Sequence, residues 1–137
     1  MPGLLEVGEL AEAMYAAWNE SGSEGLMEFL AEDCEWHDAP DLPDARVVRG
    51  KKAIGELLHV WEEGGGGLRL KLEPRELTCE GNQWVAVATA LLAGDGSGAI
   101  MLADEWCHVG DVRDGKVYRL RNFFTAEQAR EAARRPD

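Results

Sequence analysis

The chain has 137 residues, of which 45% are hydrophobic, and its formal net charge is -12. This length and apolar content predict one domain with a sizeable core and exclude a disordered chain. The negative charge argues against a nucleic-acid partner and against an anionic membrane surface, because both require clustered Lys and Arg.

The first part of the chain has the pattern of amphipathic helices. Apolar residues recur at three- and four-residue steps over residues 5–20, which predicts a first helix with one apolar stripe. A second helix is expected at about residues 24–31, with Ser21 or Ser23 as its cap. A third helix follows Gly50, where apolar residues again repeat with helical spacing.

Strand signals frame and follow these helices. Residues 34–38 alternate apolar and polar side chains, and the two prolines in residues 39–44 predict a loop. After the four glycines at 64–67 the chain is expected to be β, with turns at 81–82, 94–98 and 114–115. The strands of this part are expected at about 68–73, 84–93, 100–112 and 117–124, before a last helix that is capped by Thr125 with Gln128.

This order of elements predicts a single α+β domain over residues 1–137, with a core at about 5–130. We expect a curved antiparallel sheet whose concave face is covered by the three N-terminal helices. Inward-pointing polar side chains on that face would be costly unless they were paired or used, so they are the candidates for a site.

Side-chain alternation identifies two aspartates on the inward face. Cys34 and Trp36 are the apolar residues of the first strand, and Asp38 shares their parity. On the strand at 100–112, Asp104 shares the parity of Ile100 and Leu102. The alternative for Asp104 is an edge position or a salt bridge to one of the arginines of the next strand, Arg119 or Arg121.

Four further residues with a polar group are considered for the same cavity or its rim. Trp106 and His108 follow Asp104 with the same parity and are expected to line the cavity. Tyr15 borders the apolar stripe of the first helix, and the alternative is a core tyrosine whose hydroxyl reaches water. His37 should point to the opposite side of its strand unless a bulge intervenes.

Several segments resemble the SnoaL-like family of the nuclear transport factor 2-like superfamily. They are residues 14–18, 24–40, 49–54, 113–117 and 122–124, so the resemblance covers about residues 5–130. It implies a cone-shaped, half-open α+β barrel. This fold hosts several unrelated reactions, so the resemblance is specific for the fold more than for the chemistry.

Within this superfamily the candidate site is most similar to that of ketosteroid isomerases. That resemblance implies catalytic roles for Tyr15, Asp38 and Asp104, with Asp38 as the base and the other two as donors to an enolate oxygen. We therefore expect a cofactor-independent acid/base enzyme of the isomerase, polyketide cyclase or dehydratase type, acting on a small apolar carbonyl compound. The residues expected to bind this compound are Trp18, Trp36, Trp61, Ala88, Trp106, His108 and Phe124.

Two other functions remain open. One is a non-catalytic module for ligand binding or dimerisation, in which Asp38 and Asp104 would be paired with arginines or water. The other is epoxide hydrolysis, which requires an arginine between two carboxylates, a spacing that the sequence does not display.

The expected partners follow from composition and pattern. We expect no cofactor and no metal, because the three histidines have no ligand spacing on one element. The three cysteines lack a paired spacing, so free thiols in a cytoplasmic protein are expected. A homodimer is expected through the outer sheet face, which carries the apolar residues Val85, Val87, Leu91, Val109 and Tyr118.

Overall fold

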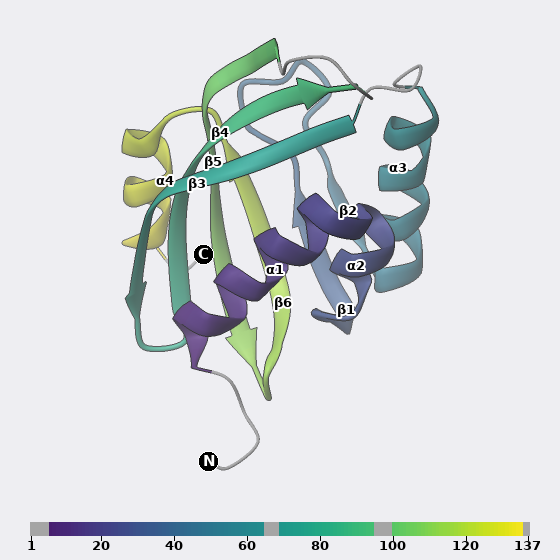
Figure 1. Ribbon diagram of the computed structural model, residues 1–137. Coiled ribbons are helices and arrows are strands. Elements are labelled where there is room, and N and C mark those ends of the chain that lie inside the picture. The colour runs from purple at the N-terminus through teal and green to yellow at the C-terminus, as the bar shows by residue number, and fades with distance from the viewer. Residues whose placement is uncertain (1–5, 65–68, 95–99, 136–137) are drawn as a thin grey trace.

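The computed structural model describes residues 6–64, 69–94 and 100–135 (Figure 1). The glycines expected to form a loop at 65–67, the first residue of the strand expected at 68, and most of the turn expected at 94–98 lie outside these ranges. In chain order the elements are α1 (Val7–Ser21), α2 (Ser23–Met27), β1 (Leu30–His37), β2 (Val47–Arg49), α3 (Lys51–Glu63), β3 (Arg69–Glu80), β4 (Gln83–Ala93), β5 (Ile100–Arg113), β6 (Lys116–Phe123) and α4 (Ala126–Ala133).

The strands form one curved sheet in the order β2-β1-β6-β5-β4-β3 (Figure 1). The run from β3 to β6 is the expected antiparallel meander. The expectation of a wholly antiparallel sheet is wrong at one place, because β1 pairs with β6 in parallel. The chain leaves β1, passes through β2, α3 and three further strands, and only then returns as β6, so no hairpin sets the relative direction of β1 and β6.

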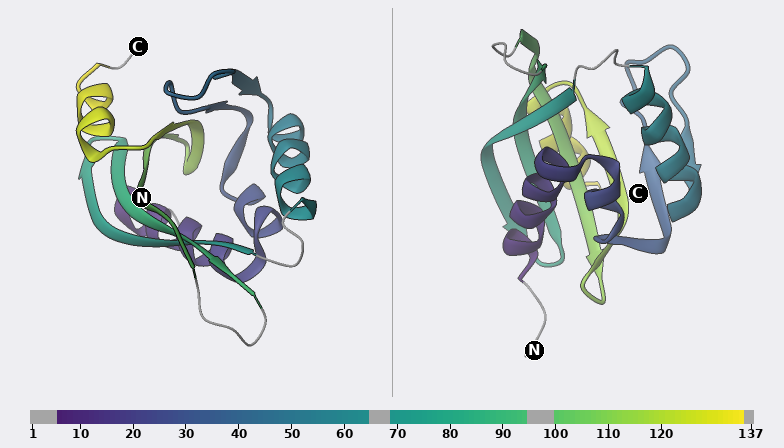
Figure 2. Two further views of the ribbon diagram at one scale, coloured as in Figure 1. Left: turned by 90° about the horizontal axis from the view of Figure 1, so that it is seen from above. Right: turned by 45° about the vertical axis from the view of Figure 1, so that its right-hand side comes forward.

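Helices cover both faces of the sheet. α1 packs against β3, and α3 packs against β1 and β2. Seen from above, the sheet curves around an interior that α1 and α2 close from below (Figure 2). This arrangement confirms the predicted α+β cone with its N-terminal helices on the concave side.

The second helix is shorter than the sequence predicted. α2 ends at Met27, and β1 already begins at Leu30, four residues before the expected strand. Leu30 is 2% exposed and pairs with Val117 of β6, so pairing with a distant strand decides the conformation of this segment. A short helical pattern was overridden by tertiary contacts.

The caps of α2 and α4 differ in part from those that the sequence predicted. Neither serine caps α2 with its side chain. Instead the backbone N–H of Ser23 donates to the Glu62 carboxylate on α3 at 2.8 Å. The predicted cap of α4 is confirmed at Thr125, whose Oγ1 accepts from the backbone N–H of Gln128 at 3.1 Å, but the predicted capping box is not formed. The side chain of Gln128 does not close a capping box, since it donates to Asp41 at 3.0 Å.

The apolar outer face that suggested a dimer is largely covered by α4. This helix packs against β4, β5 and β6 on the side away from α1. Val87 and Val109 are 3% and 0% exposed there, in a cluster with Phe123 and the alanines of α4. The apolar residues at this part of the face therefore have a partner within the chain. The homodimer remains a prediction, and the apolar residues that α4 covers no longer support it.

Candidate functional site

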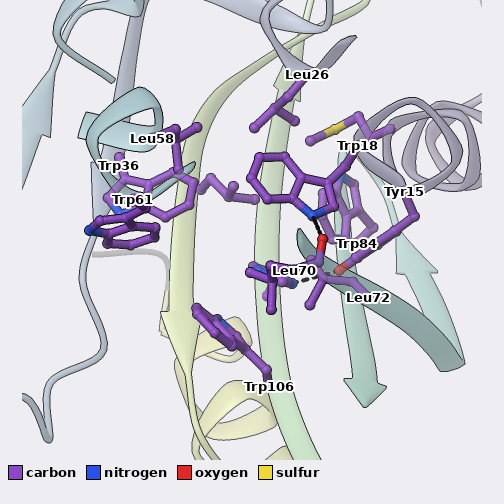
Figure 3. A pocket seen from close by; sticks show the side chains of 13 residues that line it. Tyr15, Trp18, Leu26, Trp36, Leu58, Trp61, Leu70, Leu72, Trp84 and Trp106 are labelled. Carbon is purple, nitrogen blue, oxygen red and sulfur yellow. Dashed lines mark hydrogen bonds between the residues drawn. The ribbon is translucent and has the colours of Figure 1, made fainter. Parts of the chain in front are cut away.

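A cavity of about 470 Å³, counted with its open mouth, lies between α1, α3 and the concave face of the sheet (Figure 3). Among the described residues that line the cavity none carries a formal charge at neutral pH. The lining consists of Met14, Tyr15, Trp18, Leu26, Trp36, Leu58, Trp61, Leu70, Leu72, Trp84, Trp106, His108 and Leu120, and so includes all five tryptophans of the chain.

Hydrogen bonds and ring contacts hold the indoles in place. Trp18 Nε1 donates to the carbonyl of Leu70 at 3.0 Å, which ties α1 to β3. On the opposite side of the cavity the ring of Trp36 meets the ring of Trp61 edge to face, with centroids 6.0 Å apart (Figure 3). The walls of the cavity are therefore largely apolar and aromatic.

The main polar contact of the cavity joins Tyr15 to His108. Tyr15 lies on the buried face of α1, and its hydroxyl is 2.6 Å from His108 Nδ1 on β5 (Figure 3). Their side chains come from elements 93 residues apart in the chain. Tyr15 is 6% and His108 is 5% exposed, so the pair is almost completely removed from bulk water.

Burial keeps both members of this pair uncharged at neutral pH. Desolvation raises the pKa of Tyr15 well above its usual value. It lowers the pKa of His108 to about 4, an effect that a hydrogen bond with the Asn122 side chain partly opposes. The imidazole is therefore a neutral ring that can accept or donate a proton inside an apolar cavity.

Asn122 connects the cavity to the rest of the sheet. It lies directly opposite His108 in the β5–β6 ladder. Its Oδ1 accepts from Trp106 Nε1 at 3.1 Å, and its Nδ2 donates to the carbonyl of His37 at 2.8 Å. Asn122 is only 3% exposed, and this network supplies the partners that a buried amide requires.

Asp38 lies just beyond β1 and does not line the main cavity. It borders a separate hollow together with His37, Arg121 and Asn122. Its carboxylate is already occupied, because Oδ1 accepts from Trp36 Nε1 at 3.1 Å and Oδ2 accepts from the Arg46 backbone at 3.3 Å. The Arg46 guanidinium also lies 3.5 Å from Oδ2.

The expectation that Asp104 faces the cavity is wrong. Its side chain is 74% exposed, and its carboxylate lies 3.6 Å from Arg75 of β3, not beside an arginine of β6. The cause is a β-bulge between β4 and β5. Ala88 pairs with Trp106 and Ala90 pairs with Ala103, so two residue steps on β4 lie opposite three steps on β5. One extra residue reverses the side-chain alternation, so Trp106 and His108 point inward while Asp104 points outward.

The sequence profile of the SnoaL-like domain matches residues 11–120. The chain belongs to the SnoaL-like family. A search of curated protein sequences finds no match to this chain.

Three solved structures illustrate the fold of this SnoaL-like domain. TerC, co-crystallised with polyporic acid, is 24% identical, with 90% of this chain and 94% of TerC covered and a TM-score of 0.67. A candidate polyketide cyclase from Xanthomonas campestris pv. campestris is 22% identical, with 89% and 92% covered and a TM-score of 0.66. An LEH-like epoxide hydrolase from M. tuberculosis is 18% identical, with 98% and 89% covered and a TM-score of 0.68.

The remaining predicted site residues of this SnoaL-like domain fall into two groups. Trp18, Trp36, Trp61, Trp106 and His108 line the cavity as expected. Two further residues lie behind its lining: Ala88 is fully buried opposite Trp106 in the β4–β5 ladder, and Phe124 packs edge-on against the Trp106 ring.

Sequence reasoning missed Trp84 and Asn122 as parts of the site. Both share the inward parity of their strands, which was the available signal, since Asn122 is two residues from the buried Leu120. His37 is 3.0 Å from Glu35 through Nε2, on the side of β1 away from Trp36, as its parity suggested. Over the described residues, no group of three His, Cys, Asp or Glu side chains could hold a metal ion. In that same part of the chain no helix has the length and apolar content to cross a membrane.

Proposed function

We propose that this SnoaL-like protein is a cofactor-independent acid/base enzyme that acts on a small, flat, mostly apolar carbonyl compound. The observation that carries the proposal is the Tyr15–His108 pair, 2.6 Å apart and buried in a cavity lined by all five tryptophans. Isomerisation, aldol cyclisation and dehydration all need a proton moved next to a carbonyl, which is what such a pair can do.

The proposed roles differ from those implied by the resemblance to ketosteroid isomerases. Tyr15 contacts the ligand and takes a proton on its oxygen, while its own proton passes to His108 Nδ1. Asp38 acts through Trp36, because its carboxylate holds the indole N–H at 3.1 Å and so orients one wall of the cavity. Asp104 has no part in the reaction, since its exposed carboxylate faces Arg75.

A non-catalytic ligand-binding module is the second candidate. One observation favours it: both aspartates lie beside arginines, Asp38 beside Arg46 and Asp104 beside Arg75, as that function predicted. Epoxide hydrolysis has less support. The arginine–carboxylate contacts seen in the described residues lie outside the main cavity, including the 2.8 Å contact of Arg119 with Asp111.

Proton abstraction from 5-nitrobenzisoxazole tests the proposal without knowledge of the natural substrate. In this reaction the base removes the C3 proton of a flat bicyclic molecule, the ring N–O bond breaks, and its electron pair stays on oxygen as a coloured phenolate. We expect the protein to accelerate it about 10²-fold over buffer. The rate should hold from pH 8 to about 5 and fall towards pH 4, where His108 becomes protonated.

Four substitutions separate the candidates. Y15F and H108L should reduce the rate to the buffer level. D38N should retain most of it, because an amide oxygen still accepts from Trp36. D104N is the matched control, with the same chemical change at an exposed carboxylate. Binding of the probe without acceleration would establish the ligand-binding module instead, and loss of activity in D38N alone would identify Asp38 as the base.

A further inference from the structure

The position of the Trp106 indole in the cavity wall is only partly set by its ring contacts. The indole lies nearly parallel to the His108 imidazole, at 21° with centroids 6.5 Å apart, and it meets the Phe124 ring edge to face at 5.8 Å. Such contacts fix the plane of a ring. They do not distinguish two positions that differ by a half turn about the bond to the indole, because that torsion has a broad, two-fold preference.

The amide of Asn122 distinguishes these two positions. Trp106 Nε1 donates to Asn122 Oδ1 at 3.1 Å. An indole nitrogen can only donate, so a half turn of the ring would remove its N–H from this acceptor and leave the amide oxygen without a donor. Asn122 is 3% exposed, so water has little access to the contact, and leaving these polar groups unpaired would be costly.

The amide itself is oriented by the backbone of β1. Its Nδ2 donates to the carbonyl of His37 at 2.8 Å, and a carbonyl can only accept. A flipped amide would set donor against donor at Trp106 and acceptor against acceptor at His37. Because β1, β6 and β5 are neighbours in the sheet, the indole is tied through one side chain to the backbone two strands away.

We propose that Asn122 is a positioning residue that acts through Trp106, because its amide oxygen holds the indole alongside His108. The indole in turn keeps the imidazole in place beside the Tyr15 hydroxyl, which is 2.6 Å from Nδ1. This inference rests on the proposed function, since it concerns proton transfer by the same pair. A reacting pair loses much of its rate when one member shifts by about 1 Å, so release of the indole should slow the reaction.

Proton abstraction from 5-nitrobenzisoxazole by Asn122→Leu tests this role. Leucine has nearly the shape of asparagine but accepts no hydrogen bond. We expect kcat to fall about tenfold while KM stays within about twofold, because the apolar walls remain. Asn19→Leu is the matched control, since the Asn19 amide bonds the Leu72 backbone at 2.7 and 2.9 Å and is not among the described residues that line the cavity. Its kcat should stay at the wild-type level, and an equal loss in both variants would overturn the proposal.

A double-mutant cycle with Trp106→Phe separates action through Trp106 from a direct effect of Asn122 on His108. Phenylalanine keeps an aromatic ring but has no N–H to donate. In the W106F background, Asn122→Leu should therefore change kcat by less than about twofold. An undiminished loss of kcat in that background would mean that Asn122 does not act through Trp106, contrary to the proposal.

Hydrogen exchange of the indole N–H groups, followed by NMR on the full chain, tests the contact without a substrate. In the wild-type protein the N–H of Trp106 should exchange at least about tenfold more slowly than that of Trp61, which is 42% exposed. In N122L this difference should disappear. Rapid exchange at Trp106 in the wild-type protein, or protection that persists in N122L, would contradict the proposal.

The two kinds of measurement also separate this inference from the proposed function. Absence of proton abstraction in a wild-type protein whose Trp106 N–H is protected would count against the proposed enzyme and not against the contact. If N122L does not fold, the wild-type exchange and the rate of W106F decide by themselves. A W106F protein as active as wild type would then exclude a role of Trp106 in positioning His108.

Discussion

His108 is buried uncharged in the cavity wall, so acid should favour the unfolded chain, in which the same imidazole is free to take up a proton. The ordinary pKa of histidine is about 6.5, and burial lowers that of His108 to about 4. Between these values the unfolded chain binds more protons than the folded one, and stability therefore decreases as the pH falls. The stabilisation is complete above about pH 6.5, and up to about 3 kcal/mol of it is lost by pH 4.

Urea denaturation of wild type and His108→Gln at pH 7 and pH 4 measures this loss. Carboxylates also contribute to the pH dependence of stability, for example Glu35, whose pKa is lowered in the folded protein chiefly by its hydrogen bond with His37. The informative quantity is therefore the difference between the two proteins. H108Q should lose about 3 kcal/mol less than wild type between the two pH values. His59→Gln is the control, since the side chain of His59 is 67% exposed on α3.

Equal losses in wild type and H108Q would refute the reasoning, because His108 would then titrate alike in the folded and unfolded chains. The stability that H59Q loses between pH 7 and pH 4 must also lie closer to the wild-type loss than that of H108Q does. An equal change in both variants would follow from removing any histidine and would not depend on burial.

Three further predictions concern the fold around the site. Gly110→Ala would bring a new Cβ to 2.2 Å from the Trp84 indole, so it should lower the free energy of unfolding, measured by urea denaturation, by about 2 kcal/mol. Gly64→Ala is the control, because the nearest neighbour of its new Cβ would be at 3.4 Å and the free energy of unfolding should change little. Equal effects of the two would exclude the clash. Glu62→Ala removes the acceptor at the start of α2 and should cost about 1 kcal/mol, with a neutral result assigning no capping role to this carboxylate. A thiol reagent should modify only the exposed Cys79 in the folded protein, because burial raises the pKa of Cys34 to about 12 and that of Cys107 to about 11. Rapid reaction at all three cysteines would contradict the burial of Cys34 and Cys107.

Much of this architecture follows from local sequence signals. The apolar stripe of α1, the cap at Thr125 and the alternation on β1 each depend on residues close together in the chain, and the structure confirms them. The resemblance to SnoaL-like proteins was also correct, because it rested on segments distributed over most of the chain. Where a local pattern competed with a distant partner it failed, as at Leu30, whose pairing with β6 ends the helical stretch early.

The composition of the cavity was only partly accessible from the sequence. Six of the predicted site residues line the cavity, among them Tyr15, Trp106 and His108. Periodicity could not exclude Asp104, because a bulge depends on how two strands fit together and changes no residue in the pattern of either one.

The sequence determined the residue types of the site. It supplies tryptophans, a tyrosine at the edge of the apolar stripe of α1 and a histidine on a strand, and none of them is charged at neutral pH. Only the tertiary structure decided which of them meet. Tyr15 and His108 are 93 residues apart, and their contact requires the sheet to curve under α1. The buried amide beside this pair required three strands, since Asn122 of β6 donates to the His37 carbonyl of β1 and accepts from Trp106 of β5. A hydrogen-bond network of this kind depends on groups fixed in space, and no pattern along one strand contains it.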